Sequence, residues 1–332
     1  MTHNITLIYG DGIGPEVIAS AVKVIEATGI SINWDKVIVG EKALEDQGML
    51  LPDYAINSIK TNKVALKGPV TTPVGGGFRS INVQLRQTLD LYANVRPIKS
   101  YPVKNCLYDD IDLVIVRENT EDLYLGIEHM VGKDAAESIK IITREASERI
   151  IRYAFDLARK ENRKKVTLTH KANIMKLSDG LFLESGRKVA KEYEDIEFED
   201  VIIDAMSMKL VQSPRNYDVI VAPNLYGDIL SDMAAGLIGG LGLAPGGNIG
   251  KEIAIFEAVH GTAPDIANKN IANPTSAILS GIMLLRYIDE VEGAEKIEKA
   301  LTKTLKSHGT MDLGGSLSTD EFTDEILKEM AF

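Results

Sequence analysis

The chain has 332 residues, of which 45% are hydrophobic and 26% are charged, with a formal net charge of −11. A chain of this length exceeds one small hydrophobic core, so we expect two domains in an ordinary globular protein. The negative charge argues against nucleic acid and anionic membranes as partners, and no apolar run reaches the ~20 residues of a membrane-spanning helix.

Taken in chain order, short apolar runs alternate with amphipathic stretches, which is typical of an α/β fold. The predicted buried strands cover residues 5–9, 64–66, 113–116, 166–169, 201–203, 219–222 and 253–256. The predicted helices cover residues 14–27, 80–90, 144–162, 178–193, 224–238, 274–289, 292–307 and 319–330.

Two glycine-rich segments, at residues 75–77 and 236–250, predict chain crossings or hinges rather than the interiors of elements. With crossings near residues 98 and 237, residues 1–97 and 237–332 form one large domain. Residues 98–236 form the smaller domain.

The cellular setting is inferred from cysteine usage and from the N-terminal residues. Cys106 is the single cysteine, so an intrachain disulfide is excluded and a reducing compartment is favoured. The first residues lead straight into an apolar strand, so we expect no signal or transit peptide and a cytoplasmic location.

The segment GDGIGPE at residues 10–16 invites comparison with a dinucleotide-binding fingerprint. That fingerprint requires G-x-G-x-x-G, and here the third glycine comes one residue early and is followed by Pro15. The pattern therefore predicts a tight turn from strand to helix, with proline at the helix start.

The segment NLYGDILSD at residues 224–232 follows a buried strand and opens a helix. Asp228 and Asp232 are four residues apart, so their carboxylates lie one turn apart on one helix face. A divalent cation relieves the repulsion between such carboxylates, and oxygen ligands suit Mg²⁺ or Mn²⁺. A solvated acidic face is the alternative for the pair considered alone.

Three arginines are candidates for binding anions: Arg86 on the helix 80–90, Arg96 in LYANVRP and Arg117, which packing does not explain at the tip of a buried strand. If they converge, they can bind two or three substrate carboxylates in bidentate fashion. Taken singly, each is better explained by a surface ion pair.

Other polar residues follow predicted strands, where α/β folds collect their chemistry. Lys171 and Asn173 come after the strand that ends at residue 169, and Asp204 ends the strand that begins at residue 201. Tyr124 in a loop and His260 in HGTAP are structural residues when each is considered alone.

Together these segments resemble the β-decarboxylating dehydrogenases, which include isocitrate, 3-isopropylmalate and homoisocitrate dehydrogenases. The segments that carry the likeness are GDGIGPE (10–16), KGPVTTPVGGG (67–77), LYANVRP (91–97), VRENTEDLY (116–124), HKANIM (170–175), NLYGDILSD (224–232) and HGTAP (260–264). The resemblance implies an isocitrate/isopropylmalate dehydrogenase-like α/β fold rather than a Rossmann fold, with the active site in a cleft between two domains. It also implies a homodimer with shared active sites, and a tetramer is left open.

Within this family, the helix that carries Arg86 distinguishes the substrates. Ser80 and Asn82 can donate hydrogen bonds to a distal carboxylate, and an isopropyl group would leave them unpaired. We therefore expect isocitrate, with homoisocitrate and 3-isopropylmalate as alternatives.

The resemblance also assigns the coenzyme. It implies that the loop from His260 to Asn273 holds the adenosine half and that Thr72 lies near the nicotinamide. NADP-dependent members of the family typically have Lys-Tyr where this chain has Asp265 and Ile266. An aspartate accepts hydrogen bonds from the ribose hydroxyls and repels a 2′-phosphate. NAD is therefore expected, bound by Thr72, His260, Gly261, Thr262, Ala263, Asp265, Ile266 and Asn273.

The remaining roles follow from the resemblance and from chemical need. The tricarboxylate is expected on Ser80, Asn82, Arg86, Arg96, Arg117 and Asn173, and the metal on Asp228, Asp232 and a second chain's Asp204. Lys171 would remove the hydroxyl proton and Tyr124 would protonate carbon 3, with Asp204 counted among the catalytic groups. A regulatory subunit of a hetero-oligomeric dehydrogenase is a further alternative, disfavoured because the catalytic groups are present.

Overall fold

The computed structural model describes residues 2–72 and 80–331. The chain divides into two compact units: Met1–Leu89, Ser100–Asp109 and Ala235–Phe332 form the first, and Asp90–Lys99 and Asp110–Ala234 form the second. This division differs from the expected boundaries because β4 (Ala93–Lys99) pairs along its length with β5 (Asp112–Glu118) of the second unit. Each unit is described by itself below.

The sheet of the first unit runs in the order β2-β1-β3-β12-β11 among the described residues. β1 (His3–Ile8) pairs in parallel with β2 (Ile32–Lys36) and β3 (Val64–Lys67), and β3 pairs in parallel with β12 (Ala254–Ala258). β11 (Pro245–Ile249) is antiparallel to β12. β3, β11 and β12 are buried along their whole length, as expected for strands covered on both faces.

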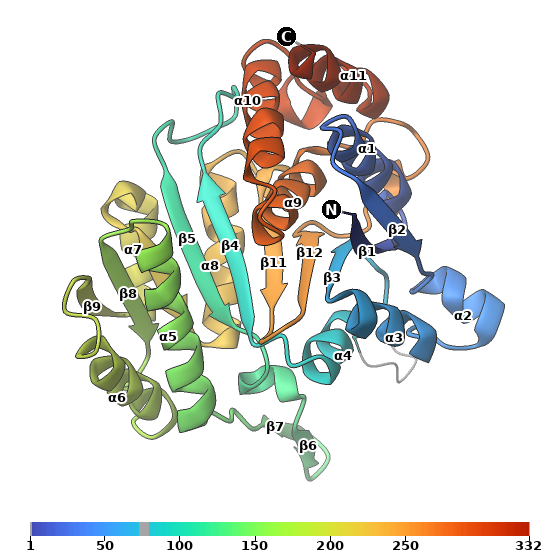
Figure 1. The fold of residues 1–332 in the computed structure, drawn as a ribbon. Helices are drawn as coiled ribbons and strands as arrows, with labels where there is room; N and C mark the ends of the chain where they lie inside the picture. Colours follow the sequence, from blue (N-terminus) through green and yellow to red (C-terminus); the bar gives the residue numbers. More distant parts are fainter. Residues whose placement is uncertain (1, 73–79, 332) are drawn as a thin grey trace. The chain divides into compact units, whose positions relative to one another are not determined.

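Helices cover this sheet and pack against each other (Figure 1). α9 (Thr275–Tyr287) lies on β3, β11 and β12, and it contacts α1 (Gly14–Glu26) and α10 (Val291–Ser307). α11 (Thr319–Met330) packs on α1 and α10, and α3 (Asp53–Asn62) packs on β1 and β3. The shorter helices are α2 (Glu41–Gln47) and α4 (Ile81–Thr88). The apolar sides of these helices form the core of the unit.

The sheet of the second unit runs in the order β4-β5-β10-β8-β9. β5 and β8 (Lys165–His170) flank β10 (Val219–Ala222) in parallel, and β9 (Glu197–Ile202) extends the sheet beyond β8. α5 (Arg144–Lys160) and α6 (Ser178–Ala190) pack side by side on it. α7 (Ile203–Gln212) contacts β8 and β9, and α8 (Asn224–Leu237) follows β10 directly.

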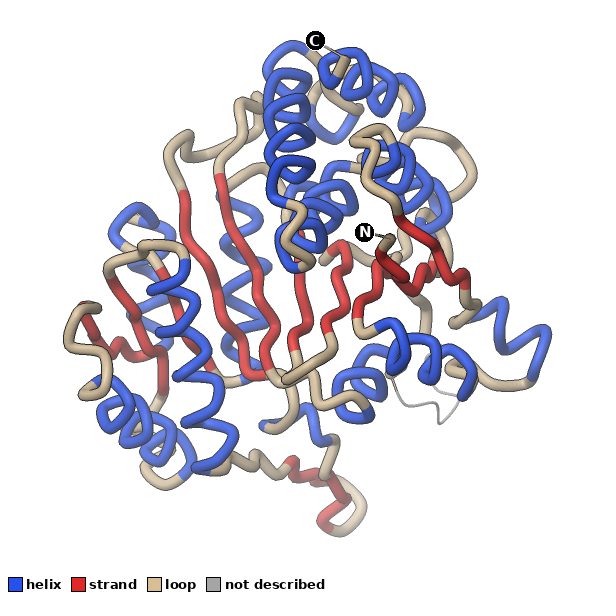
Figure 2. Tube along the Cα trace, viewed as in Figure 1, coloured by secondary structure: helices blue, strands red, loops and turns tan. Residues whose placement is uncertain are grey.

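A separate hairpin of β6 (Glu128–Val131) and β7 (Ala135–Ser138) projects from the second unit (Figure 2). Every residue in both strands is exposed. A two-stranded hairpin of this kind has little stability of its own, and it carries apolar side chains into solvent, including Met130 and Val131.

The predicted α/β class is confirmed, and each predicted strand and helix overlaps an observed one. Two predictions were wrong. The glycine-rich segment after residue 236 is not only a hinge, because Gly246 and Gly247 lie inside the buried strand β11. Asp204 does not end a strand, because β9 stops at Ile202 and Asp204 lies in the first turn of α7. The other glycine-rich segment, residues 75–77, lies outside the described residues.

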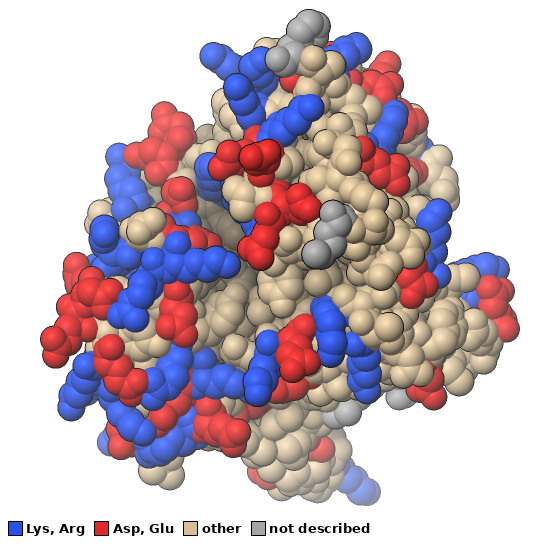
Figure 3. Space-filling view, viewed as in Figure 1, with Lys and Arg blue, Asp and Glu red and all other residues tan. Residues whose placement is uncertain are grey.

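The surface shows how the negative net charge is distributed. On the face in Figure 3, acidic and basic side chains alternate over both units, without a large field of one sign. No helix among the described residues has the length and apolar character needed to span a membrane.

Candidate active site

Arg117 is the best buried of the predicted site residues, with 1% of its surface exposed at the tip of β5. Its Nε and Nη2 atoms donate to Oδ1 of Asn224, at 2.9 Å and 2.7 Å, and Nη1 donates to Asp228. A buried guanidinium is tolerated only when its N–H groups are paired. The start of α8 supplies these partners.

A glycine makes this contact between strand and helix possible. A Cβ at Gly227 would lie 2.6 Å from Cβ and Cγ of Arg117. The side chain of Arg117 therefore passes over α8 at the one position where the NLYGD segment lacks a side chain. Gly227 thus makes room for the side chain of Arg117, and Asn224 and Asp228 on the same helix bind its guanidinium.

Arg96 on β4 approaches the same helix. Its Nη1 lies 2.9 Å from Oδ1 of Asp232 and 2.5 Å from Oγ of Ser231, and its Nη2 lies 3.3 Å from Oδ1 of Asp228. Its Nε donates to Oδ1 of Asn94 at 2.8 Å. Two of the three predicted arginines therefore meet on the two aspartates of α8.

The aspartates keep part of their surface open. The side chain of Asp228 is 30% exposed and that of Asp232 is 52% exposed. Burial raises the pKa of Asp232 above its ordinary value, Arg96 opposes the rise, and the neighbouring Asp228 adds to it. Two carboxylates one helical turn apart, with accessible oxygens, are suited to a hard divalent cation.

Tyr124 completes this cluster. Its hydroxyl donates to Oδ2 of Asp228, and the guanidinium carbon of Arg117 lies 4.8 Å from the centre of its ring. Burial raises the pKa of the Tyr124 phenol, while the positive charge of Arg117 opposes the rise. The hydroxyl therefore stays protonated at neutral pH and can donate a proton.

Lys171 and Asp204 form a second cluster in the same unit. Nζ of Lys171 lies 2.7 Å from Oδ1 of Asp204, whose side chain is 69% exposed, and this contact lowers the pKa of the carboxyl. Among the described residues no three Asp, Glu, His or Cys side chains gather around a potential metal position. Asp204 therefore does not join Asp228 and Asp232 within one chain. Asn173 lies exposed in the loop after β8.

In the first unit, Arg86 lies in a buried charged group that the sequence did not reveal. Nη2 of Arg86 is 3.7 Å from Oε1 of Glu257, whose Oε2 lies 2.5 Å from Nζ of Lys67. Nδ2 of Asn248 donates to Oε1 of Glu257 at 2.7 Å. Burial alone would raise the pKa of Glu257, but Lys67 and Arg86 lower it to about 2. Glu257 therefore holds a full negative charge beside the predicted substrate arginine.

Ser80 and Asn82 lie at the start of α4, one to two turns before Arg86. Oγ of Ser80 accepts the N–H of Val83 at 3.5 Å as the helix N-cap, and its hydroxyl hydrogen donates to no other described residue. Oδ1 of Asn82 is buried without a hydrogen-bond partner among the described residues. Thr72 is tied to this helix, because its Oγ1 accepts the N–H of Ile81 at 3.3 Å.

The predicted coenzyme loop follows β12. Nε2 of His260 is buried without a hydrogen-bond partner among the described residues, and burial lowers the pKa of this histidine. Ala263 has φ +40°, a left-handed conformation that costs free energy for a residue with a Cβ and is typical of functional loops. Gly261, Ala263 and Asp265 are exposed, and Thr262 and Ile266 are partly exposed.

Asn273, the last residue of this predicted loop, uses its side-chain amide in hydrogen bonds within the protein. Its Nδ2 donates to Oδ2 of Asp312 at 3.0 Å, and its Oδ1 accepts the N–H of Thr275 at the start of α9. Both ends of its amide are therefore used by the protein, and its role in binding adenine stays a prediction.

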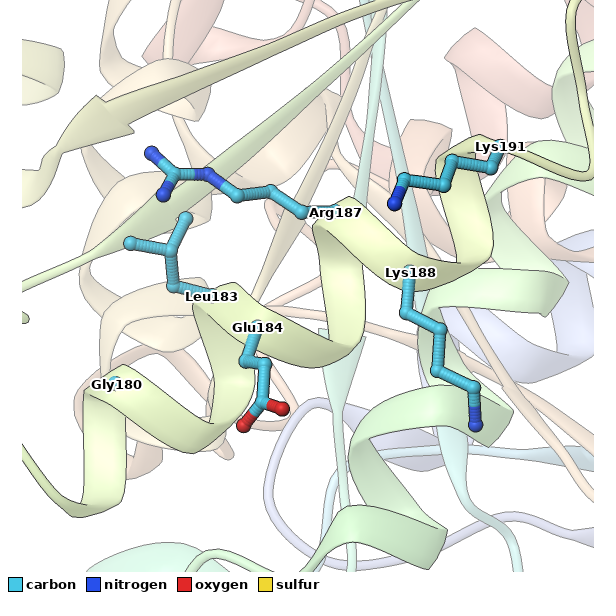
Figure 4. Close-up of a pocket in the computed structure, with 6 residues that line it drawn as sticks. All are labelled: Gly180, Leu183, Glu184, Arg187, Lys188 and Lys191. Carbon is cyan, nitrogen blue, oxygen red and sulfur yellow. The ribbon is translucent and has the colours of Figure 1, made fainter.

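The second unit has a surface hollow of about 360 Å³ that is lined by other residues than the predicted site residues (Figure 4). Its walls come from α6 and the residue that caps it: Gly180, Leu183, Glu184, Arg187, Lys188 and Lys191. Arg187 pairs with Asp200 and Lys188 pairs with Glu148, so these cations already have acidic partners. The hollow is a solvated charged helix face and contains none of the predicted site residues.

One protein family matches nearly the whole chain. The family described as isocitrate/isopropylmalate dehydrogenase matches residues 4–326. The chain belongs to the isocitrate/isopropylmalate dehydrogenase family. The expected family and fold are thereby confirmed.

Individual members of this family are similar over nearly the whole chain. A crystal structure of isocitrate dehydrogenase from Methylococcus capsulatus is 55% identical, with a TM-score of 0.97, over 99% of this chain and 100% of that chain. A mitochondrial protein of Drosophila melanogaster, named as the probable alpha subunit of NAD isocitrate dehydrogenase, is 51% identical over 99% of this chain and 88% of its own length. A mitochondrial protein of Dictyostelium discoideum, named as a regulatory subunit of NAD isocitrate dehydrogenase, is 52% identical over 99% of this chain and 92% of its own length.

Proposed function

We propose that this chain catalyses the NAD-dependent oxidative decarboxylation of isocitrate to 2-oxoglutarate and CO₂. The observation that carries the proposal is the meeting of Arg96, Arg117 and Tyr124 on Asp228 and Asp232. It places two cations, one proton donor and two metal-type ligands in one cluster. The names of the relatives described above support the same reaction.

The two arginines are suited to bind substrate carboxylates. Both side chains are largely buried, and in such an environment a charge-assisted hydrogen bond is stronger than in water. Both guanidinium groups are held on the aspartates of α8, which fixes the orientation of their N–H groups. On the first unit, Arg86, Ser80 and the buried oxygen of Asn82 offer donors and an acceptor for a carboxylate and its neighbours.

The donor set fits a divalent ion. Asp228 and Asp232 would hold it with open oxygens, and Asp204 would come from a second copy of the chain, since it is exposed and separate within one chain. When bound, Mg²⁺ or Mn²⁺ would supply Lewis-acid polarisation of the substrate hydroxyl and of the developing carbonyl. Which of the two metals is used stays a prediction.

The chain offers two groups for proton transfer. Lys171 of a second copy would take the proton from the hydroxyl on carbon 2 as hydride leaves for NAD⁺. Tyr124 would donate its phenolic proton to carbon 3 after CO₂ is lost. Each such step contributes ~10²–10⁴ in rate when the donor or acceptor is in place.

NAD is the coenzyme that fits the loop after β12. The exposed carboxylate of Asp265 can accept hydrogen bonds from ribose hydroxyls and would repel a 2′-phosphate. Nε2 of His260 is buried and has no hydrogen-bond partner in residues 2–72 and 80–331, which supports a ligand at this loop.

We also propose that at least two chains assemble. Exposed apolar side chains lie on the segments that carry Lys171, Asp204 and Asp228: Ile174, Leu177, Met208, Val211 and Ile229. Apolar surface of this kind is typical of interfaces between protein chains. A homodimer remains our prediction, but two relatives are named as subunits, which favours a hetero-oligomer as the alternative. The predicted cytoplasmic location also stays a prediction.

A regulatory subunit is the second candidate, favoured by the name of the Dictyostelium relative. Such a chain would bind ligands without turnover. Against it stand Tyr124, Lys171, Asp204, Asp228 and Asp232, all of which are present with the contacts described above.

An assay of the purified chain tests the proposal. Isocitrate, homoisocitrate and 3-isopropylmalate should be compared with NAD or NADP, with Mg²⁺ and after treatment with EDTA. We expect the highest kcat/KM with isocitrate and NAD, and loss of turnover after EDTA that added Mg²⁺ or Mn²⁺ restores.

Two variants serve as a matched pair in this assay. Asp232→Asn should raise the Mg²⁺ concentration required for half-maximal rate, whereas Asp195→Asn should not, because Asp195 is exposed and pairs with Arg159. A chain that binds isocitrate but never turns it over, alone or mixed with its relatives, would favour the regulatory role. Undiminished turnover in EDTA would contradict the metal site.

A further inference from the structure

The turn between β1 and α1 lies between two segments that the proposed function assigns to the coenzyme. The N–H of Asp11 donates to the carbonyl of Pro69 at 2.8 Å, in the segment that leads to Thr72. The N–H of Ile13 donates to the carbonyl of Thr262 at 2.9 Å, in the loop after β12. One short turn therefore contacts both segments through its backbone.

The glycines of this turn allow the close approach on both sides. Gly10 and Gly12 have φ +78° and +60°, in the left-handed region that glycine adopts without strain. A Cβ at Gly10 would lie 2.0 Å from the carbonyl oxygen of Pro69, and one at Gly12 would lie 2.0 Å from that of Thr262. The GDGIG pattern thus fulfils a packing requirement of these two contacts.

Asp11 adds a side chain to the same connection. Its Oδ2 accepts the N–H of Thr71 at 2.8 Å and its Oδ1 accepts the N–H of Glu41 at 3.1 Å, with only 7% of the residue exposed. Thr71 in turn donates from Oγ1 to Oγ1 of Thr262 at 3.4 Å. The carboxylate therefore fixes the backbone next to Thr72, and the hydroxyl of Thr71 connects that backbone to the loop after β12.

We propose that Asp11 is a positioning residue for dinucleotide binding. Its carboxylate sets the segment before Thr72 at a constant distance from Thr262, so that the nicotinamide and adenosine halves meet a preformed site. This proposal rests on the proposed function, because it takes the coenzyme residues from it. It goes further in assigning coenzyme affinity to a residue whose carboxylate is buried and bound to two backbone N–H groups.

Asp11→Asn tests the proposal with little change in volume. An asparagine can accept one of the two N–H groups, but its own NH₂ then faces the other donor. We expect the dissociation constant of NADH, measured by its fluorescence, to rise by about tenfold or more, as for the loss of one charge-assisted hydrogen bond. The KM for isocitrate, measured at saturating NAD, should change by less than about threefold, because Arg96 and Arg117 belong to other elements.

Asp35→Asn is the matched control. Asp35 lies in the same unit and its Oδ2 accepts hydrogen bonds from Ser58 and Asn62, at 2.6 Å and 3.1 Å, outside the two coenzyme segments. This variant should keep wild-type affinity for NADH. A second variant, Gly40→Ala, disturbs the same carboxylate from the other side, because its Cβ would lie 2.2 Å from Oδ2 of Asp11.

The outcomes separate this proposal from the proposed function. Selective loss of NADH affinity in Asp11→Asn supports it, and if that variant does not fold, the same loss in Gly40→Ala does. NADH affinity equal to wild type, an equal loss for both ligands, or unfolding of both variants overturns it. Failure of the wild-type chain to oxidise isocitrate with NAD would instead overturn the proposed function.

Discussion

The hydroxyl of Tyr124 and the carboxylate of Asp228 form a direct hydrogen bond, with Asp228 also bound by Arg117. The phenol is therefore held in one orientation by a carboxylate whose own position is fixed by a buried guanidinium. This arrangement suits a proton donor that acts once per turnover at one carbon atom.

The first prediction concerns Tyr124→Phe. Removal of the hydroxyl should lower the rate of oxidative decarboxylation by about 10²–10⁴-fold, the range for one general acid. Reduction of added oxalosuccinate by NADH should fall much less, because that half-reaction requires no proton at carbon 3. Stopped-flow absorbance of NADH measures both rates, and equal losses in the two would exclude this role.

The second prediction concerns Gly227→Ala. The new Cβ would meet the side chain of Arg117 at 2.6 Å, so the guanidinium must leave its position on Asn224 and Asp228. We expect the KM for isocitrate to rise by about tenfold or more, since one good charge-assisted contact is lost.

Gly236→Ala provides the control on the same helix. A Cβ at Gly236 meets no atom of the described residues within 4 Å. Activity should be unchanged, and the free energy of unfolding should rise by about 0.5–1 kcal/mol, because alanine is the better helix former. If Gly227→Ala behaves like this control, the close contact does not position Arg117.

The third prediction concerns Asp265→Lys combined with Ile266→Tyr. The carboxylate of Asp265 would repel a 2′-phosphate, whereas the ammonium group of the new lysine would attract it. The ratio of kcat/KM for NADP to that for NAD should increase by at least about tenfold, measured with saturating isocitrate. An unchanged preference would mean that the adenosine site lies elsewhere.

The fourth prediction concerns pH and Glu121. Burial raises the pKa of this carboxyl from 4.5 to about 7, although Thr143 donates to it from both its N–H and its hydroxyl. The folded state thus binds the proton more tightly than the unfolded state. The free energy of unfolding should therefore fall as the pH rises from 4.5 to about 7, and this contribution should be constant above that range, with a total of about 3 kcal/mol.

Urea unfolding at several pH values between about 5 and 8 measures this effect. Glu121→Gln should show a smaller fall than the wild type, whereas Glu145→Gln, at an exposed position on α5, should show the same fall. Identical slopes for wild type and Glu121→Gln would contradict the raised pKa.

Much of the fold could be predicted because local pattern and tertiary environment agree. α10 and α11 carry an apolar stripe at helical spacing, and the start of α11 has a capping box of Ser318 and Glu321. β11 could not be predicted, since its sequence PGGNI contains one large apolar residue. It forms because the backbone pairs with β12 and because Gly247 leaves room for the ring of Phe256.

The candidate site was predictable in part for a similar reason. Asp228 and Asp232 are neighbours on one helix, so their spacing predicted two adjacent carboxylates, although the pair alone also fitted a solvated acidic face. Lys67 and Glu257 are far apart in the sequence, and their pairing depends on β3 and β12 being neighbours in the sheet. A lone charged residue at the end of a strand is a usable signal, but its partner emerges only from the topology.

The missing side chain at Gly227 also limits how this site can be transplanted. Since β5 and α8 interlock at that position, a chimera that takes the helix from one donor and the strand from another must keep a glycine facing the arginine. The two segments therefore have to be exchanged together. Grafting β5 alone would leave the guanidinium of Arg117 without its partners, and grafting α8 alone would leave the space at Gly227 unfilled.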